Sequence, residues 1–316
     1  MVASNKKLTL YVSVAWILTI LALIARLLSR LLAYDEGIGY FTETIFPIAY
    51  RVLTILITIH ALSALLIFRR FSFPDSALAE MKEPHVAEKI ASMIASIAML
   101  LVLIAFGVVY WINPLVTPGG LQLFGLITAI LSLFFFLFFW APSNRGKTLH
   151  ILLGYALILH FLYILCSSYF EIFTPMNNPV KILTQVCSIA SILFLLGDLR
   201  FFLNIAKPAF FIGASTAVIG FGTISVLSGA FFRLPSDEYT IIYHISNATV
   251  FAMLIYATIR ATRFLYLCLQ AEEADLLEDD PSEAVETDTV CDTEDAKDSS
   301  TAPQTSDDSK DQDTES

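Results

Sequence analysis

Long stretches of apolar residues alternate with short polar connections along most of the chain. A membrane-spanning helix needs about 20 mostly apolar residues, because the hydrocarbon core is about 30 Å thick and a helix rises 1.5 Å per residue. Pro, Gly, Asn and charged residues gather between the stretches, as is typical of helix ends. We therefore predict an all-α, polytopic integral membrane protein with eight transmembrane helices. The predicted spans are 8–28, 47–68, 90–111, 121–140, 149–170, 181–203, 209–231 and 241–267.

The composition supports this prediction. Hydrophobic residues make up 56% of the chain and charged residues 15%, whereas soluble domains average about 45–50% and about 25%. Residues 1–270 contain 17 Lys and Arg and 11 Asp and Glu, while residues 271–316 contain 2 Lys and 18 Asp and Glu. These values exclude an ordinary soluble enzyme, a nucleic-acid-binding protein and a disulfide-stabilised scaffold. The chain divides into a transmembrane domain at 1–270 and an acidic tail at 271–316.

The tail lacks aromatic residues and consists mainly of Asp, Glu, Ser, Thr, Ala and Pro. Such a segment cannot bury enough apolar surface to offset the entropy of ordering, so we expect it to be disordered. A weak amphipathic continuation of the last helix through Leu276 and Leu277, before Pro281, stays open. Its charge should keep it away from an anionic membrane surface. Two roles stay open for the tail: a solvated extension, or a binding segment for a basic protein partner.

The connections carry their Lys and Arg residues asymmetrically. Short cytoplasmic loops of membrane proteins are enriched in Lys and Arg. Alternate connections place 12 cations on one side, while the other side has Arg30, Lys181 and Arg233. We therefore expect a multi-pass protein of the cell membrane with both termini in the cytoplasm. The 12 cations are Lys6, Lys7, Arg69, Arg70, Lys82, Lys89, Arg145, Lys147, Arg200, Lys207, Arg260 and Arg263.

Three segments of the first half resemble segments of the second half at an offset of 129 or 130 residues. A 4+4 tandem repeat explains these matches, and four spans per half would give both halves the same orientation. Parallel repeats of this kind occur in transporters, with the substrate site between the halves. The alternative is that apolar helices with similar loop chemistry become similar by chance. The matched segments are 40–47 with 169–175, 51–54 with 181–184, and 70–71 with 200–201.

Arg51 and Lys181 occupy equivalent positions under this repeat, and each follows an acidic residue, Glu43 and Glu171. A charge inside a span is costly and often functional, so the two cations can line an outer vestibule for an anion. The other interpretation is that these long side chains snorkel to the headgroups or pair with the loop carboxylates. Both interpretations stay open at this point.

Asp198 is the only carboxylate within a predicted span, two residues before Arg200. A buried Asp in a membrane is a candidate proton carrier or cation ligand. The alternative is a structural ion pair, for which Arg200 and Lys207 are the expected partners. These residues complete the candidate polar site.

His60 and His160 lie at similar predicted depths, roughly 12–17 Å from the cytoplasmic surface at 1.5 Å per residue. Imidazoles that face each other across a bundle can ligate haem b or a metal. No Cys/His spacing motif accompanies them, and an interhelical hydrogen bond is the usual role of such a residue. We therefore expect no metal site and no cofactor, with haem b as the alternative.

Small residues predict where helices pack closely, because they let backbones approach one another. Span 209–231 is rich in them, and spans 90–111 and 181–203 have similar faces, so these three should form the packed centre. By contrast, the aromatic run 134–140 is bulky on all sides and should face lipid. The expected packing residues are Gly213, Ala217, Gly220, Ser225, Gly229, Ala91 and Ala95.

The sequence contains no recognisable catalytic or nucleotide-binding motif, so an enzyme is not expected. A transporter of a small solute or ion fits the repeat, the small-residue helices and the short loops. A membrane sensor, scaffold or complex subunit that acts through its loops and tail is the alternative, and a haem protein or membrane enzyme is the third. The lipid bilayer is a partner in every case. A transporter predicts a polar cavity near mid-membrane, whereas a scaffold predicts a solid bundle.

Overall fold

The computed structural model of this chain describes residues 5–35, 40–42, 44–109, 119–140, 147–170, 178–229 and 237–278. Eight helices in these ranges are long and apolar enough to cross a membrane, as predicted. Each predicted span falls on one of them. They are α1 (Asn5–Ala33), α2 (Ile45–Ile67), α4 (Val86–Gly107), α5 (Gly120–Leu137), α6 (Lys147–Phe170), α7 (Pro179–Phe202), α8 (Pro208–Gly229) and α9 (Asp237–Glu278).

Four short elements were not predicted, because each is too short to have a periodic pattern. Helix α3 (Asp75–Glu80) follows Pro74, which fixes its own φ angle, and has Asp75 in its first turn, where a carboxylate is favoured by the helix dipole. The 3₁₀ helix η2 (Phe138–Trp140) continues α5. Strands β1 (Tyr34–Asp35) and β2 (Tyr40–Phe41) pair antiparallel and connect α1 to α2.

The start of α4 and the start of α7 are both fixed by side chains. At α4, His85 accepts a hydrogen bond from the Ala87 amide, and the Glu88 carboxylate accepts one from the His85 amide 2.9 Å away. At α7, the Asn178 side chain accepts from two amides of the first turn, and Pro179 stands where no amide is needed. These caps position Glu88 at one end of the bundle and Lys181 at the other.

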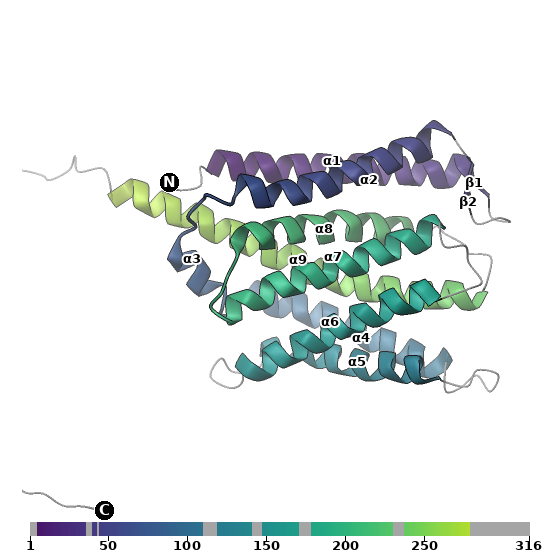
Figure 1. Cartoon of the computed structure of the whole chain (residues 1–316). Helices are drawn as coiled ribbons and strands as arrows, with labels where there is room; N and C mark the ends of the chain where they lie inside the picture. The colour runs from purple at the N-terminus through teal and green to yellow at the C-terminus, as the bar shows by residue number, and fades with distance from the viewer. Residues whose placement is uncertain are drawn as a thin grey trace, which may run out of the picture. The chain divides into compact units, whose positions relative to one another are not determined.

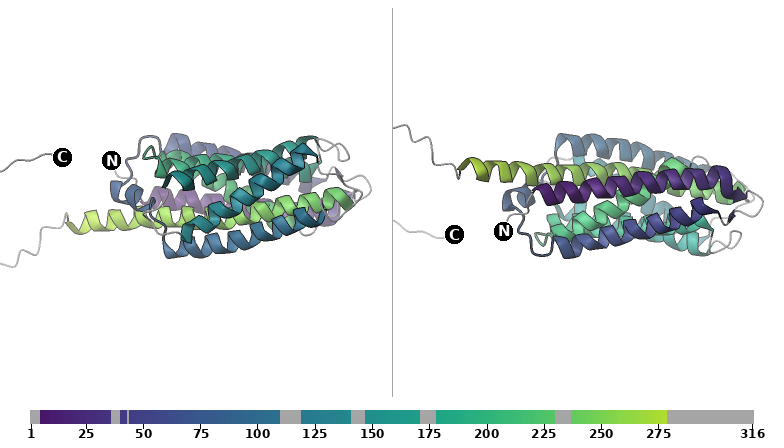
Figure 2. Two further views of the ribbon diagram at one scale, coloured as in Figure 1. Left: turned by 90° about the horizontal axis from the view of Figure 1, so that it is seen from below. Right: turned by 90° about the horizontal axis from the view of Figure 1, so that it is seen from above.

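The helices form an antiparallel bundle in which α8 is central (Figure 1). Helix α8 packs against α1, α2 and α7, while α6 packs against α7 and α5, and α5 packs against α4. Helices α7 and α8 have the largest share of buried residues. The start of α1, helix α3 and the end of α9 lie at one end of the bundle, and the β1–β2 ribbon lies at the other (Figures 1 and 2).

Glycines of α8 explain its central place. A Cβ atom at Gly213 would lie 2.5 Å from the Ala61 carbonyl oxygen of α2, and one at Gly220 would crowd α1 and α2. At the far end, Gly229 leaves room for the side chains of Asn247 and Tyr243 of α9. Of the other expected packing residues, Ala91, Ala95 and Ser225 are buried, and Ala217 is half-buried.

The aromatic run of α5 does not face lipid on all sides, which corrects the prediction. Phe134 and Trp140 are exposed, but Phe135, Phe136 and Phe139 are buried. The buried rings lie within 5.7 Å of the Tyr256 ring of α9. The reason is geometric: successive residues of a helix point about 100° apart, so even a uniformly bulky run presents one face to its neighbours.

Helix α9 continues to Glu278, beyond the predicted start of the tail at residue 271. The predicted disordered segment from residue 279 onward lies outside the described residues. The segment 271–278 is therefore helical where the sequence analysis assigned it to the tail.

Candidate functional site

A cluster of charged side chains lies inside the bundle, near the end that contains α3. Its centre is Arg260 of α9, whose side chain is completely buried. The guanidinium donates two hydrogen bonds to Asp198 Oδ1 of α7, from Nε at 2.9 Å and from Nη2 at 2.7 Å. Its Nη1 donates to Glu88 Oε1 of α4 at 2.7 Å. One arginine thus joins three helices that are far apart in the sequence.

The second oxygen of each carboxylate also has a donor. The Tyr256 hydroxyl donates to Asp198 Oδ2 at 2.6 Å. Glu88 Oε2 accepts from Arg263 Nη1 at 2.7 Å, in addition to the amide of its own cap. We call Glu88, Asp198, Tyr256, Arg260 and Arg263 the Arg260 network.

The Arg260 network also holds the connection between α3 and α4. Arg260 Nη1 donates to the Met81 carbonyl oxygen at 3.0 Å. Arg263 donates to the carbonyl oxygens of Glu83 at 2.5 Å and Glu80 at 2.8 Å. Two side chains of α9 therefore fix the backbone of this connection across one end of the bundle.

The network is electrically balanced, with two guanidinium groups and two carboxylates. Four carboxylate oxygens all accept hydrogen bonds, so the burial of the charges is compensated. An aromatic layer packs beside it: the Arg260 guanidinium lies 5.5 Å from the Phe202 ring, and the His150 ring stacks on Phe135 at 4.7 Å. The network thus joins α4, α7 and α9 near one end of the bundle.

Asp198 forms its ion pair with Arg260, not with Arg200, one of the two partners that the sequence analysis named for a structural pair. Arg200 does not bind it; the Arg200 guanidinium lies 5.0 Å from the Phe210 ring instead. Residues 198 and 200 are about 200° apart around the helix, so they point to different sides of α7. Glu88 also lies within a spanning helix, so Asp198 is not the only carboxylate in a span.

Four members of this cluster, Glu88, Tyr256, Arg260 and Arg263, were not among the predicted site residues. Two signals were available. Arg260 lies inside the predicted span 241–267, where a charge is a candidate for function, and it was counted only as a topological signal. Tyr256, Arg260 and Arg263 are spaced by four and three residues, which places them on one face of a helix.

A line of buried polar residues runs along one face of α7 from Lys181 to Asp198. The spacing of three, four, three and seven residues keeps them on the same side of the helix. Two of their hydroxyl groups donate hydrogen bonds within the helix. Thr184 donates to the Val180 carbonyl oxygen at 3.1 Å, and Ser188 donates to the Thr184 carbonyl oxygen at 2.9 Å. We call this line the α7 polar face. It comprises Lys181, Thr184, Ser188, Ser191 and Asp198.

Two cations, Arg26 and Lys181, are buried near the opposite end of the bundle. Arg26 of α1 is buried, lies 4.8 Å from the Tyr50 ring and donates to the Pro179 carbonyl at 3.3 Å. Lys181 is completely buried, so it does not snorkel. Arg51, its counterpart under the repeat, is exposed.

The two acidic residues of the predicted outer vestibule are not placed. Glu43 and Glu171 lie outside the described residues. The structure thus positions Arg51 and Lys181 at the same end of the bundle, but it shows neither the carboxylates expected beside them nor a shared contact between the two cations.

The two histidines of the haem hypothesis face different helices. His60 Nε2 lies 3.0 Å from the Tyr11 carbonyl oxygen, and its ring stacks on the Tyr11 ring of α1. His160 Nδ1 lies 3.1 Å from Thr128 Oγ1 of α5. The similar depth of the two residues did not predict these different neighbours, because depth in the membrane does not specify how each helix is rotated about its axis. Within the described ranges, no group of three His, Cys, Asp or Glu side chains is arranged to hold a metal ion.

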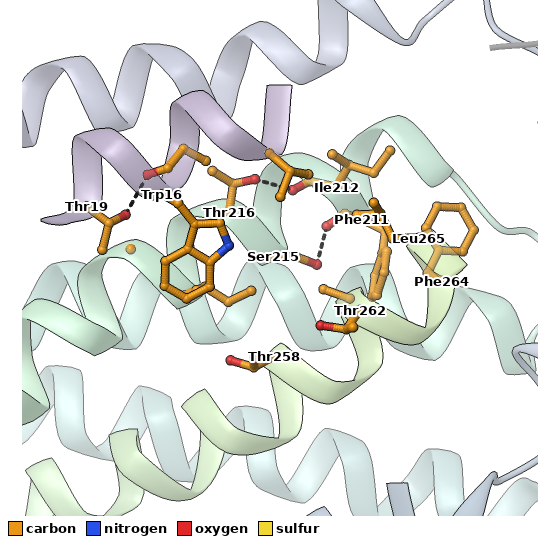
Figure 3. Close-up of a pocket in the computed structure, with 15 residues that line it drawn as sticks. Trp16, Thr19, Phe211, Ile212, Ser215, Thr216, Thr258, Thr262, Phe264 and Leu265 are labelled. Carbon is orange, nitrogen blue, oxygen red and sulfur yellow. Dashed lines mark hydrogen bonds between the residues drawn. The ribbon is translucent and has the colours of Figure 1, made fainter. Parts of the chain in front are cut away.

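Three cavities along the sides of the bundle are lined mainly by apolar residues. One of about 80 Å³ lies between α1, α8 and α9, and Figure 3 shows Trp16, Thr216 and Thr258 around it. The hydroxyl groups of Ser215 and Thr216 donate to carbonyl oxygens of their own helix. The other two, of about 250 Å³ and 340 Å³, lie between α2 and α7. None of these three is the polar mid-membrane cavity that a transporter predicts.

Comparison with known proteins gives no family assignment. No family model, no curated protein and no solved structure matches this chain.

Proposed function

We propose that this protein moves a small solute or ion across the membrane along the α7 polar face. The observation that carries the proposal is the line of buried polar residues on one side of α7, which runs from Lys181 to Ser191 and, after the apolar residues Phe194 and Leu195, resumes at Asp198 in the Arg260 network. Buried ionisable residues in membrane helices mark solute, ion or proton pathways in many membrane proteins.

The Arg260 network acts in this proposal as a closed gate. Its three ion pairs join α4, α7 and α9, and its hydrogen bonds to main-chain oxygens fix the α3–α4 connection. A solute reaches the path from that end only when the ion pairs separate. Packed interfaces of this kind have discrete arrangements rather than continuous deformation, which suits alternating closed and open forms.

The proposed topology places the chain in a cell membrane with the Arg260 network on the cytoplasmic side. The asymmetry of Lys and Arg in the connections supports this orientation. We also propose that the chain is a 4+4 repeat. The matched segments relate α1–α2 to α6–α7, and both α2 and α7 pack against α8. We propose in addition that the acidic tail is a disordered cytoplasmic segment that can bind a basic protein partner.

Thiol labelling of Ser188 tests the path without knowledge of the solute. The variant Ser188→Cys is made in a background in which Cys166, Cys187, Cys268 and Cys291 are replaced by Ala. A membrane-impermeant thiol reagent is applied from either side of oriented membranes. We expect slow labelling with the network intact and labelling at least about tenfold faster when Arg260→Gln is added. The substitution breaks both ion pairs of Arg260 and leaves buried carboxylates without this partner, which destabilises the closed form by about 3–5 kcal/mol for each pair broken.

Two controls make the labelling result decisive. Arg70→Gln removes an exposed arginine at the same end and should leave the rate unchanged. Ser76→Cys, on the exposed surface of α3, reports that the reagent is present. Equal, negligible labelling of Ser188→Cys with and without Arg260→Gln, in folded protein and with Ser76→Cys labelled, contradicts the proposed path.

A membrane scaffold or complex subunit is the second candidate. The observation that favours it is the saturation of the Arg260 network, in which every carboxylate oxygen already has a donor, as in a static clamp. A scaffold predicts that Ser188→Cys stays unreactive in both backgrounds, so the same experiment separates the two functions.

A further inference from the structure

We propose that the groove between α2 and α7 binds an anionic phospholipid, with an acyl chain in the groove and the phosphate at Arg51. The groove consists of the two cavities of about 340 Å³ and 250 Å³, which share Val186 as a lining residue. Both are open along the side of the bundle. Their sizes are close to those of ordinary ligand pockets, about 300–1,000 Å³.

The walls of the groove are apolar along its length. Helix α2 lines it at positions spaced by three and four residues from Tyr50 to Leu65, and α7 does so from Pro179 to Leu193. Small residues of α8, Gly213, Ala214 and Ala217, form the floor of the smaller cavity. These residues have small side chains, and α2 and α7 do not fill the space between them. The result is a channel that suits a flexible hydrocarbon chain.

The length of the groove fits an acyl chain. From Arg51 to Leu65 the axis of α2 rises about 21 Å at 1.5 Å per residue. One leaflet of the hydrocarbon core is about 15 Å thick, half of about 30 Å. A chain anchored at Arg51 can therefore lie in the groove over the whole depth of its leaflet.

Arg51 supplies charge complementarity at one end of the groove. It lines the larger cavity and is exposed. Within the part of the chain that the structure describes, it makes neither an ion pair nor a side-chain hydrogen bond. It lies in the second turn of α2, where a long cationic side chain reaches the headgroup region and its charge attracts an anionic headgroup. The aromatic rings of Phe41 and Tyr50 line the same end.

Native mass spectrometry of the full-length protein, released from nanodiscs of equal phosphatidylglycerol and phosphatidylcholine, tests the proposal. We expect a bound phospholipid with phosphatidylglycerol preferred. Arg51→Gln should lower that preference by about fivefold, since one cation near the membrane surface contributes about 1 kcal/mol. Arg69→Gln, the same change on an exposed arginine just beyond the other end of α2, should leave it unchanged, and Arg51→Lys should retain most of it.

A second pair of variants tests the hydrocarbon part of the site. Val186→Trp fills the junction of the two cavities and should remove most of the bound lipid of both kinds. Leu101→Trp, on an exposed face of α4, should not. Equal lipid retention by the two Trp variants overturns the proposal. The proposal is also overturned if the unchanged protein is a dimer and Val186→Trp dissociates it, because the groove would then hold a second copy of the chain. An unchanged headgroup preference in Arg51→Gln overturns the anionic site.

Discussion

The two ends of the bundle solve the problem of buried charge in different ways. At the α3 end, two arginines and two carboxylates neutralise one another, and each carboxylate oxygen has a donor. At the β1–β2 end, the described residues bury Arg26 and Lys181, and Arg26 lies against the aromatic rings of Phe41 and Tyr50. The described contacts at the first end are directional ion pairs, and those of Arg26 at the second end include two aromatic rings and the Pro179 carbonyl oxygen. One end of the bundle is thus held by ion pairs across three helices, and the other has buried cations beside aromatic rings and an apolar groove.

Arg260→Leu should have the largest effect, because it leaves two buried carboxylates without their main partner. We expect the free energy of unfolding to fall by about 3–5 kcal/mol. Denaturation of the purified protein in mixed micelles, followed by circular dichroism, measures this. A loss below about 1 kcal/mol would mean that the carboxylates are protonated or hydrated in the folded protein, and the α3 end would no longer be the one held by ion pairs.

Arg26→Leu makes the corresponding change at the other end, where it removes the contacts of the guanidinium with the Tyr50 ring and the Pro179 carbonyl oxygen. A desolvated cation over an aromatic ring contributes about 2 kcal/mol, and leucine restores part of the packing. We expect a loss of about 1–2 kcal/mol in the same measurement. A loss equal to that of Arg260→Leu would show that the two ends do not differ in how strongly their arginines are held.

Tyr256→Phe removes only the hydroxyl that donates to Asp198. A hydrogen bond to a charged group contributes about 1.5–3 kcal/mol, and the ring contacts with α5 are retained. We expect a loss of about 1.5 kcal/mol. The double variant Tyr256→Phe with Arg260→Leu should show a smaller increment, since both residues bind the same carboxylate; strict additivity would argue against a coupled network.

Arg51→Gln should change stability least. The side chain is exposed, and surface substitutions of this kind usually lie within about 0.5 kcal/mol. The midpoint of thermal unfolding in detergent should therefore match that of the unchanged protein. A clear loss of stability in detergent without phospholipid would give Arg51 a structural role that its surroundings do not suggest.

The helices were predictable, and the contacts between them were not. Eight apolar stretches of spanning length give eight helices because the bilayer thickness alone sets that length. Asp198 was recognisable as a buried charge from its place in a span. Its partner was not, because Arg260 lies 62 residues away in the sequence and the pairing depends on how α7 and α9 pack.

Rotation about the helix axis was the second quantity that the sequence left undetermined. His60 and His160 lie within their predicted spans, but each faces a different neighbour. The wrong prediction for the aromatic run of α5 has the same cause. Composition showed that the run is bulky, but only the contacts with α9 show which rings are buried. Lys181 is buried although its place near a helix start favoured snorkelling.

The arginines of α9 bind main-chain oxygens at Glu80, Met81 and Glu83. Every amino acid supplies the same carbonyl group, so evolution can exchange the exposed side chains at positions 80 and 83 freely. The number of residues between α3 and α4 cannot change as easily, since one insertion or deletion would shift all three oxygens out of register with the guanidinium groups. Homologous chains should therefore differ in the residue types of this segment while preserving its length.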